Sequence, residues 1–426
     1  MADRTATFAG QIEIGKVLIT SIITGNKIDV TNLMVELNIY ENLFSNYLTG
    51  TITITDSIDL INYIPLVGEE KLEISYKTPG MKDSDALVDN MFYIYKVANR
   101  ILMKENSQMY VIHFMSEEGF SDQHVKVAKA YKGNYAAMAK SIFGDEDALG
   151  ASDKQVSKFN VEETANAFQF VAPTWSPMKC INWLAARSIS KHARAANYVF
   201  YQDMFKYNFV SINSLIAKPA SMKFYNSTMN IKQLRELHKT EDLTQYNILR
   251  NMTNDLVFDV STRMAGGMYA SRGIFCDLLS KTINIREYDY IGKFKDTNHL
   301  NEFPMNSSKF LRNPGSCVVT YTNHVNMYDE FQSDDPETWL LQRRSLVQQI
   351  GSYVSEITVA GRSDYVCGMT IELETNTVRN HPTSEDAVEK MNKGKFLVVA
   401  IHHRISKAEM ECILRVVKES LIINLK

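Results

Sequence analysis

Residues 92–101 read FYIYKVANRI, and residues 396–405 read FLVVAIHHRI, which repeats the same pattern near the end of the chain. The two stretches align at a constant offset of 304 positions, so that their arginines coincide. At the same offset Ile112 falls on Val416, so the alignment crosses the connecting loop without a gap. Any two hairpins alternate apolar and polar residues, but the ungapped register and the matched arginines indicate a true internal duplication.

Shorter matches lie upstream of both hairpins in the same order. Residues 52–54 resemble residues 357–359, and residues 72–74 resemble residues 371–373. The spacing between the matches is shorter in the second copy. We therefore expect two strand-rich regions with related folds.

Period-2 alternation extends through most of the first 118 residues, and it returns after residue 353. The expected strands of the first region cover residues 33–39, 51–55, 71–76, 92–99 and 109–115. Those of the last region cover residues 353–360, 369–373, 396–402 and 411–417. Strands with short connections and no helix between them favour an antiparallel barrel or sandwich.

The middle of the chain has mixed patterns. Helical spacing covers residues 131–143, and Ser176-Pro177 starts a helix that runs to about Ser188. Another helix should start at Asp335-Pro336 and end at Gly351. Strands at 256–260 and 273–275 flank Gly266-Gly267, which predicts a hairpin.

These patterns predict a mainly β protein with an α+β middle region, in which two related antiparallel β-barrel domains accompany an inserted mixed domain. The expected first barrel covers residues 1–118. The mixed domain is assigned to residues 119–220 and 263–314, and the discontinuous second barrel to residues 221–262 and 315–422.

Composition excludes several classes of function. The net charge is −3 at pH 7, so the chain lacks the basic excess that nucleic-acid binding requires. No apolar run approaches the ~20 residues that span a bilayer, and the N-terminus lacks the layout of a signal peptide. Cysteines stand at 180, 276, 317, 367 and 412 without a CxxC pair, which predicts buried free thiols. We expect a cytoplasmic site of synthesis.

Adjacent histidines at 402 and 403, together with His113, could suggest a metal site. Neighbours on a strand point to opposite faces, so both histidines could not bind one ion without distortion. A surface or packing role is favoured, and no metal site is predicted.

Other short motifs are incomplete as sites. The stretch Gly361-Arg362-Ser363-Asp364 lacks the GxSxG pattern of a nucleophile, Gly394-Lys395 lacks a phosphate-binding loop, and no helix is expected after Gly266-Gly267. All three are interpreted as turns. Adjacent carboxylates occur at Glu69-Glu70, Glu117-Glu118 and Asp334-Asp335. Two carboxylates act as an acid and a base only when their environments differ, and we expect all three of these pairs to lie in solvated loops. The sequence predicts no catalytic, cofactor-binding or metal-binding residue.

The order of these parts resembles the central baseplate hub protein of contractile-tailed bacteriophages. Residues 40–52, YENLFSNYLTGTI, are similar to that family's first-barrel segment, and Gly68 to Ile74 are similar to its next strand. Residues 172–184 resemble the start of its middle-domain helix. Residues 359–371 and 396–416 resemble its second barrel. Phage late-control proteins and the hub domains of secretion-system spikes are related to this family.

The resemblance implies a structural, non-enzymatic protein of the virion that assembles in the host cytoplasm and needs no cofactor. It also implies a homotrimer whose two barrels per chain form a six-part ring around a channel. One face would bind the hexameric tail tube and other baseplate proteins, and the opposite face would bind the trimeric membrane-piercing spike. No membrane insertion and no sequence-specific binding of nucleic acid are expected.

Two alternatives stay open at this point. A tail-associated cell-wall hydrolase would need a catalytic carboxylate pair or a metal set. A secretion-system spike would carry a Gly-rich β-helical extension after the barrels, and the sequence given stops at Lys426 without one.

Overall fold

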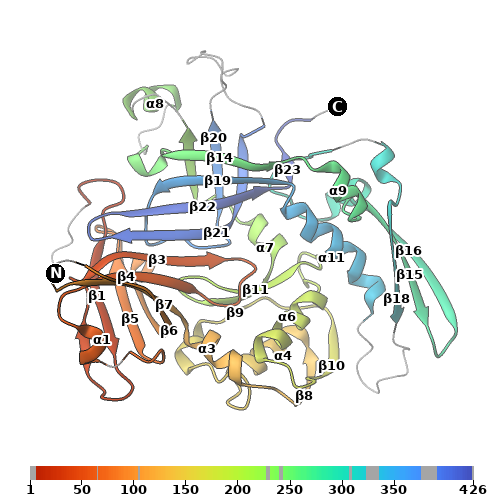
Figure 1. Cartoon of the computed structure of the whole chain (residues 1–426). Helices are drawn as coiled ribbons and strands as arrows, with labels where there is room; N and C mark the ends of the chain where they lie inside the picture. The colour runs from red at the N-terminus through yellow and green to blue at the C-terminus, as the bar shows by residue number, and fades with distance from the viewer. Residues whose placement is uncertain are drawn as a thin grey trace.

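The structure is a computed structural model, and it describes residues 6–64, 66–103, 106–226, 231–238, 243–306, 309–322, 335–375 and 391–424. Within these ranges the strands form one large sheet, mostly antiparallel, and several small ones. Figure 1 shows the large sheet as a stack of strands that runs from β14 through β21 to β3 and β4. The prediction of a mainly β chain with a mixed middle region is confirmed at this level.

The first half of the large sheet is called the first unit. Its strands are β1 (Glu13–Thr20), β3 (Met34–Asn42), β4 (Thr49–Asp56), β5 (Lys71–Lys77), β6 (Val88–Leu102) and β7 (Gln108–Ser116). They lie in the order β3-β4-β7-β6-β5-β1, and β2 (Lys27–Asp29) pairs with β1. Alternating residues such as Ile52 and Ile54 are buried between them.

The second half is called the second unit. Its strands are β13 (Met222–Asn226), β14 (Asn251–Val257), β19 (Tyr353–Ala360), β20 (Thr370–Thr375), β21 (Gly394–Ser406) and β22 (Met410–Lys418). They lie in the order β14-β19-β22-β21-β20-β13. When the strands of each unit are numbered in chain order, the second unit has the same spatial order of strands as the first unit. One direction differs, because β1 is antiparallel to β5 whereas β13 is parallel to β20.

Register confirms the correspondence of the first hairpin strands. Leu72 faces Phe92 in the first unit, and Ile371 faces Phe396 in the second. Both β6 and β21 also carry a bulge at the equivalent position, after Ile94 and after Val398. The offset of 304 positions therefore holds along these two strands as far as Ala98 and His402. Strand β6 then has a second bulge that β21 lacks, so beyond it Leu102 is the equivalent of Ile405, and the arginines at 100 and 404 do not coincide.

The ungapped alignment across the hairpin loop is wrong. Val97 pairs with Ile112, and the equivalent Ile401 pairs with Leu414, so the offset falls to 302 positions in the second strand of the hairpin. The first hairpin contains a further bulge after Ala98 and is longer. A shift by two residues leaves the same face buried, so apolar alternation could not reveal it.

The middle region packs against the lower edge of both units in Figure 1. It contains β8 (Ala130–Asn134), β9 (Asn160–Val161), β10 (Ala167–Val171), β11 (Tyr198–Gln202), β12 (Tyr207–Ser211), α3 (Glu117–His124), α4 (Tyr135–Gly144), α5 (Asp153–Lys158), α6 (Pro177–Arg187) and α7 (Ile212–Ala217). Its core is aromatic, and Phe143 lies within ring-contact distance of Phe159, Phe200 and Tyr207. Residues 131–134 belong to β8, so the expected helix at 131–143 begins only at Tyr135.

A sheet of β15 (Ala270–Asp277), β16 (Thr282–Asp289) and β18 (Ser316–Thr322) packs on α11 (Pro336–Ile350). The expected hairpin around Gly266-Gly267 is wrong. Strand β14 pairs with β19 and not with β15. Helix α9 (Val260–Ala265) lies between β14 and the glycines, and Asp259 caps its N-terminus by accepting a hydrogen bond from the amide of Thr262. The glycines therefore follow a helix end.

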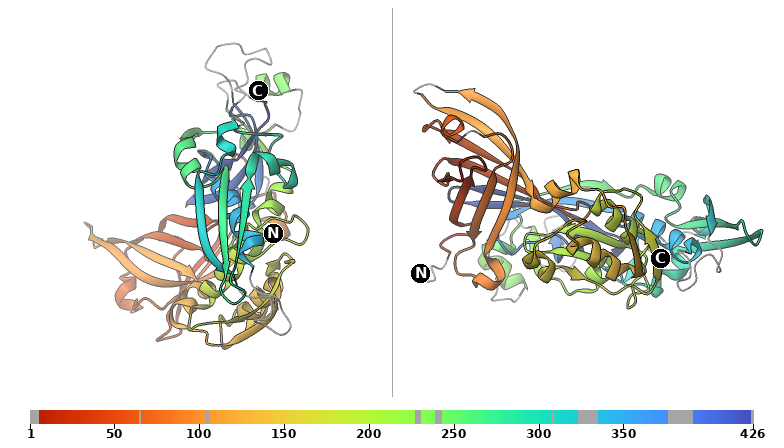
Figure 2. Two further views of the ribbon diagram at one scale, coloured as in Figure 1. Left: turned by 90° about the vertical axis from the view of Figure 1, so that its right-hand side faces the viewer. Right: turned by 90° about the horizontal axis from the view of Figure 1, so that it is seen from below.

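The remaining described elements are short. They are α1 (Leu60–Tyr63), α2 (Asp83–Ala86), α8 (Ile231–His238), η1 (Gln245–Asn247), α10 (Tyr290–Lys293), η2 (Phe294–Asp296), β17 (Phe303–Pro304), η3 (Lys309–Arg312) and β23 (Ser420–Leu421). Figure 2 shows that the β6–β7 hairpin and the β15–β16 hairpin project from opposite ends of the molecule.

Candidate functional site: the junction between the two units

Strand β21 joins the two units, because it has two partners along one edge. Residues 394–397 pair with β20 of its own unit, whereas residues 400–406 pair with β3 of the first unit in antiparallel register. The bulge after Val398 lies where the partner changes. The two units therefore share one continuous sheet (Figure 1).

A buried ion pair crosses this junction. The Nε2 atom of His403 lies 2.7 Å from Oε1 of Glu41, and the two side chains are 1% and 0% exposed. The other carboxylate oxygen of Glu41 accepts a hydrogen bond of 2.9 Å from the backbone amide of Cys367. One side chain of the first unit thus binds two segments of the second unit.

The second ring nitrogen of His403 also has a partner. Its Nδ1 lies 3.5 Å from the Sγ of Cys412 on β22. Burial by itself lowers the pKa of His403, but the neighbouring Cys412 and Glu41 outweigh burial and raise it to about 10. Because a buried charge costs several kcal/mol without a partner, Glu41 and His403 depend on each other.

Apolar contacts surround the ion pair. Ile405 faces Leu37 across the junction, and both side chains are buried to 1% exposure or less. At the solvent edge, Arg404 donates to Oε2 of Glu36 from Nε at 3.1 Å and from Nη2 at 3.0 Å. The junction therefore has a buried core and a charged rim, as a stable protein–protein interface does.

A second contact joins the units away from β3. The amide of Thr78 donates to Oγ of Ser363 at 3.0 Å, and the amide of Ser363 donates to Oγ1 of Thr78 at 2.9 Å. Both residues are buried. This reciprocal pair leaves each hydroxyl engaged, so Ser363 is a structural contact between the units.

The middle region is fixed to the first unit by polar groups next to the junction. Oε1 of Gln202 accepts from the amide of Leu48 at 3.0 Å and from Oγ of Ser116 at 2.6 Å. Tyr207 donates to Glu118 at 2.9 Å, and burial raises the pKa of Glu118. Burial, followed by the nearby Glu41, raises the pKa of Asp203 to about 6.

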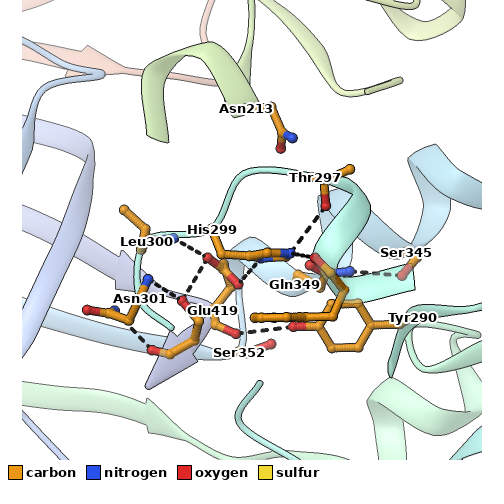
Figure 3. A network of polar contacts seen from close by, with 12 residues as sticks. Asn213, Tyr290, Thr297, His299, Leu300, Asn301, Ser345, Gln349, Ser352 and Glu419 are labelled. Carbon is orange, nitrogen blue, oxygen red and sulfur yellow. Dashed lines mark hydrogen bonds and ion pairs between the residues drawn. The ribbon is translucent and has the colours of Figure 1, made fainter. Parts of the chain in front are cut away.

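A further buried network fixes the end of the described chain (Figure 3). The carboxylate of Glu419 accepts from the amide of Leu300 at 2.7 Å and lies 2.9 Å from Nδ1 of His299. The Nε2 atom of His299 lies 2.6 Å from the carbonyl oxygen of Phe294. Asn301 donates from its amide to Oγ of Ser420 at 2.7 Å. The network ties the segment after α10 to the strand that follows β22.

The three histidines singled out in the sequence do not converge. His402 points to the face opposite His403, where its Nε2 lies 2.7 Å from Oδ1 of Asn38 and its ring stacks on Tyr40. His113 lies beside Tyr95 in the first unit. Within the described ranges, no group of three or more His, Cys, Asp or Glu side chains is arranged to hold a metal ion.

The expectation that the carboxylate pairs lie in solvated loops is wrong for two of their members. Glu70 is buried, because its carboxylate accepts from the amides of Val67 at 2.6 Å and Gly68 at 3.0 Å. Glu118 is also buried, against Tyr207. Asp335 caps α11 through the amide of Glu337, and Asp334 lies outside the described residues.

The cysteines are free thiols, as predicted, but they are not all buried. Cys180, Cys367 and Cys412 are buried, whereas Cys276 is half-buried and Cys317 is exposed. The last two lie on β15 and β18, in a sheet whose outer face is uncovered among the described residues. Of the motifs interpreted as turns, Ser363-Asp364 forms a turn, beside which Arg362 pairs with Asp364 at 2.6 Å. The interpretation is wrong for Gly394-Lys395, which begins β21 and pairs with β20, and Lys395 donates to the carbonyl of Ile216.

The sequence could have revealed the buried pair in part. Alternation places His403 on the same face as Ile401 and Ile405, so a core position and hence a polar partner were predictable. Its partner Glu41 comes from the other unit, and no local pattern identifies it. As for membranes, no helix among the described residues is long and apolar enough to span a bilayer.

The comparisons with known proteins concern the fold. No protein-family model matches the sequence, and no curated protein sequence matches it. A tail protein from Neisseria meningitidis MC58 aligns over 95% of this chain and 96% of its own, with a TM-score of 0.55 and 11% identity. The 43 kDa tail protein of prophage MuSo2 from Shewanella oneidensis aligns over 95% of this chain and 98% of its own, with a TM-score of 0.54 and 9% identity.

Both similar structures are tail proteins, and both alignments extend over almost the whole of each chain. At such low identity the likeness concerns the arrangement of strands and helices and not the residues of a site. The chain therefore has the fold of phage tail proteins, the class of protein that its sequence resembles.

Proposed function

We propose that this protein is the central hub of a contractile-tail baseplate, in which three copies form a ring of six similar blocks around a channel. The observation that carries the proposal is the correspondence of the two units, which repeat one strand order within a single sheet. Three copies of a chain that contains two similar blocks combine threefold and approximate sixfold symmetry.

We further propose that each unit is a barrel-type block. Two hydrogen bonds support this, because each connects one outer strand of a unit to the segment before the opposite outer strand. In the first unit they are β1 and β3, and in the second unit β13 and β14. The amide of Val30 donates to the carbonyl of Val17 at 2.9 Å, and the amide of Leu249 donates to the carbonyl of Tyr225 at 3.0 Å. In a barrel-type block, each unit would curve so that its outer strands approach each other in this way.

The proposed domain division follows the sequence: residues 1–118, residues 119–220 with 263–314, and residues 221–262 with 315–422. The placement of β13 and β14 beside β20 and β19 supports the discontinuous second domain. Strand β18, at the start of its last segment, pairs instead with β15 of the middle region.

The two symmetries suggest two kinds of partner. Six similar blocks can offer equivalent surfaces to a hexameric tail tube. The middle region and the β15–β16–β18 sheet occur once per chain, so three copies of them suit a trimeric spike and neighbouring baseplate proteins. The protein would act in the virion, after assembly in the host cytoplasm.

The proposed role needs no catalysis and no cofactor, and the polar groups described above support it. Glu41, His403, Thr78 and Ser363 all form contacts between units, where rigidity is useful. The alternative of a cell-wall hydrolase is tested separately, because the purified chain should release no more peptidoglycan fragments than buffer does. Release above that level would contradict the structural role.

Electron microscopy of the purified protein with the product of the neighbouring gene tests the hub itself. We expect class averages with a ring of six similar blocks around a channel and a spike on one face. Particles that stay monomeric at assembly concentrations, or rings without approximate sixfold symmetry, would refute the proposal.

A further inference from the structure

The β21–β3 junction, called the filled junction below, has an equivalent in the first unit where β6 lacks such a partner strand among the described residues. Strand β6 is the equivalent of β21, and its residues 88–93 pair with β5 just as residues 394–397 of β21 pair with β20. Beyond its bulge, β21 pairs with β3. Among the described residues, the equivalent stretch of β6, residues 96–102, has a strand partner only on its β7 side.

The missing partner has an equivalent as well. Strand β14 occupies the position in the second unit that β3 occupies in the first, because Leu37 pairs with Ile52 and Met252 pairs with the equivalent Ile357. Strand β3 has neighbours on both edges, whereas β14 is the last strand of the sheet in the part of the chain that the structure describes. Each molecule therefore presents one free edge of each type.

The side chains on these edges differ from those at the filled junction in one consistent way. Ile405 is 0% exposed where β3 covers β21, but Leu102, its equivalent beyond the second bulge of β6, is 78% exposed. Val399 is 6% exposed, and the equivalent Tyr95 is 40% exposed. Large apolar side chains on a free strand edge promote pairing with another chain.

We propose that residues 96–102 of β6 in one copy pair with β14 in the next copy, in antiparallel register and with the geometry of the β21–β3 junction. The register follows from the filled junction, where Ile405 faces Leu37. Their equivalents are Leu102 and Met252, because Leu37 pairs with Ile52 and Met252 pairs with the equivalent Ile357. Leu102 of one copy thus faces Met252 of its neighbour.

The contact cannot form within one molecule, because six strands of the large sheet separate β14 from β6. It is head-to-tail, and such contacts generate a closed ring or an open filament. The inference rests on the proposed three-copy ring for its closure, but the strand pairing follows from the two free edges alone.

Disulfide cross-linking tests the register. Cys276 and Cys317 are first replaced by serine, because they are the thiols that solvent reaches. Leu102→Cys and Met252→Cys are then combined in the full chain; Leu102 is exposed and Met252 is half-buried, so the fold should tolerate both changes. Directly opposite residues in an antiparallel pair have Cβ atoms about 4.5–5.5 Å apart, within reach of a disulfide after slight adjustment.

The expected result after mild oxidation is a covalent species of three chains on a non-reducing gel, which dithiothreitol converts back to single chains. Leu102→Cys combined with Asn254→Cys is the matched control, because a diagonal pair lies about 7–8 Å apart. Its yield should be at least about five-fold lower. Either cysteine alone should give no three-chain product.

The other outcomes separate the pairing from the proposed function. A trimer in sedimentation without cross-links, or with equal yield from the displaced pair, would overturn the register and leave the hub intact. A ladder of cross-linked species longer than three chains would support the edge pairing and contradict the three-copy ring. A monomer at all concentrations would overturn both.

Discussion

Glu41 and His403 stand 362 positions apart in the chain, and their side chains meet at 2.7 Å in the buried junction between the two units. Each residue belongs to a different copy of the repeated strand pattern. The contact therefore reports directly on whether the units are joined, and its loss should be measurable in the stability of the whole chain.

Replacing either partner should destabilise the protein. His403→Gln and Glu41→Gln each leave a buried polar or charged group without its partner, and such losses cost about 3–5 kcal/mol. Unfolding in urea, followed by fluorescence, gives the free energies. Because both changes remove one interaction, the double variant should lose clearly less than the sum of the single losses, and strict additivity would contradict the pairing.

Stability should also depend on pH through His403. Its pKa rises from 6.5 to about 10 on folding, so the stabilisation is complete below about pH 6.5 and is lost as the pH rises through 10. The loss is on the order of 5 kcal/mol. Other groups titrate in this range, so the measured quantity is the difference between wild type and His403→Gln. A difference that stays constant from pH 6.5 to 10 would disprove this assignment.

Equivalent apolar residues of the two units should respond differently to a charge. Ile405→Lys places an ammonium group at a fully buried position and should unfold the second unit. Leu102→Lys changes a side chain that is 78% exposed, so the free energy of unfolding of the monomer should change by less than about 0.5 kcal/mol. The same variant should weaken self-association in sedimentation. Unchanged self-association would argue against the proposed role of β6.

A glycine in β4 allows a close approach that no side chain permits. A Cβ atom at Gly50 would lie 2.3 Å from Cζ of Phe114 and 2.5 Å from the backbone oxygen of Asn38. Gly50→Ala should therefore lower the melting temperature by several degrees, at a cost of about 1–3 kcal/mol. Gly15→Ala, where the nearest atom would be the Oγ of Ser75 at 3.4 Å, is the matched control and should be close to neutral.

Much of this fold could be predicted from the sequence because its strands are patterned locally. The starts of α6 and α11 were predictable from Ser176-Pro177 and Asp335-Pro336. The strands from β3 to β7 and from β19 to β22 were predictable from the alternation of apolar and polar residues. The helix between β14 and β15 was missed, because two glycines can end a helix as well as form a turn.

Long-range features of the junction could not be predicted in the same way. Alternation identifies which face of β21 is buried, but the pairing of β21 with β3 joins segments that are hundreds of residues apart. A shift of two residues in a hairpin also keeps every side chain on its face, so the change of offset at Leu414 left no trace in the pattern. No local sequence pattern identified Glu41 as a buried residue.

The β21–β3 junction also has a consequence for the speed of assembly. If six blocks were separate chains, every contact in a ring would require a diffusional encounter, and incomplete rings would accumulate whenever subunits were scarce. Because the junction forms within one chain, its two halves meet at an effective concentration in the millimolar range and fold together. Half of the contacts in the proposed ring would then exist before any two molecules collide, and only three contacts between molecules would remain to be formed.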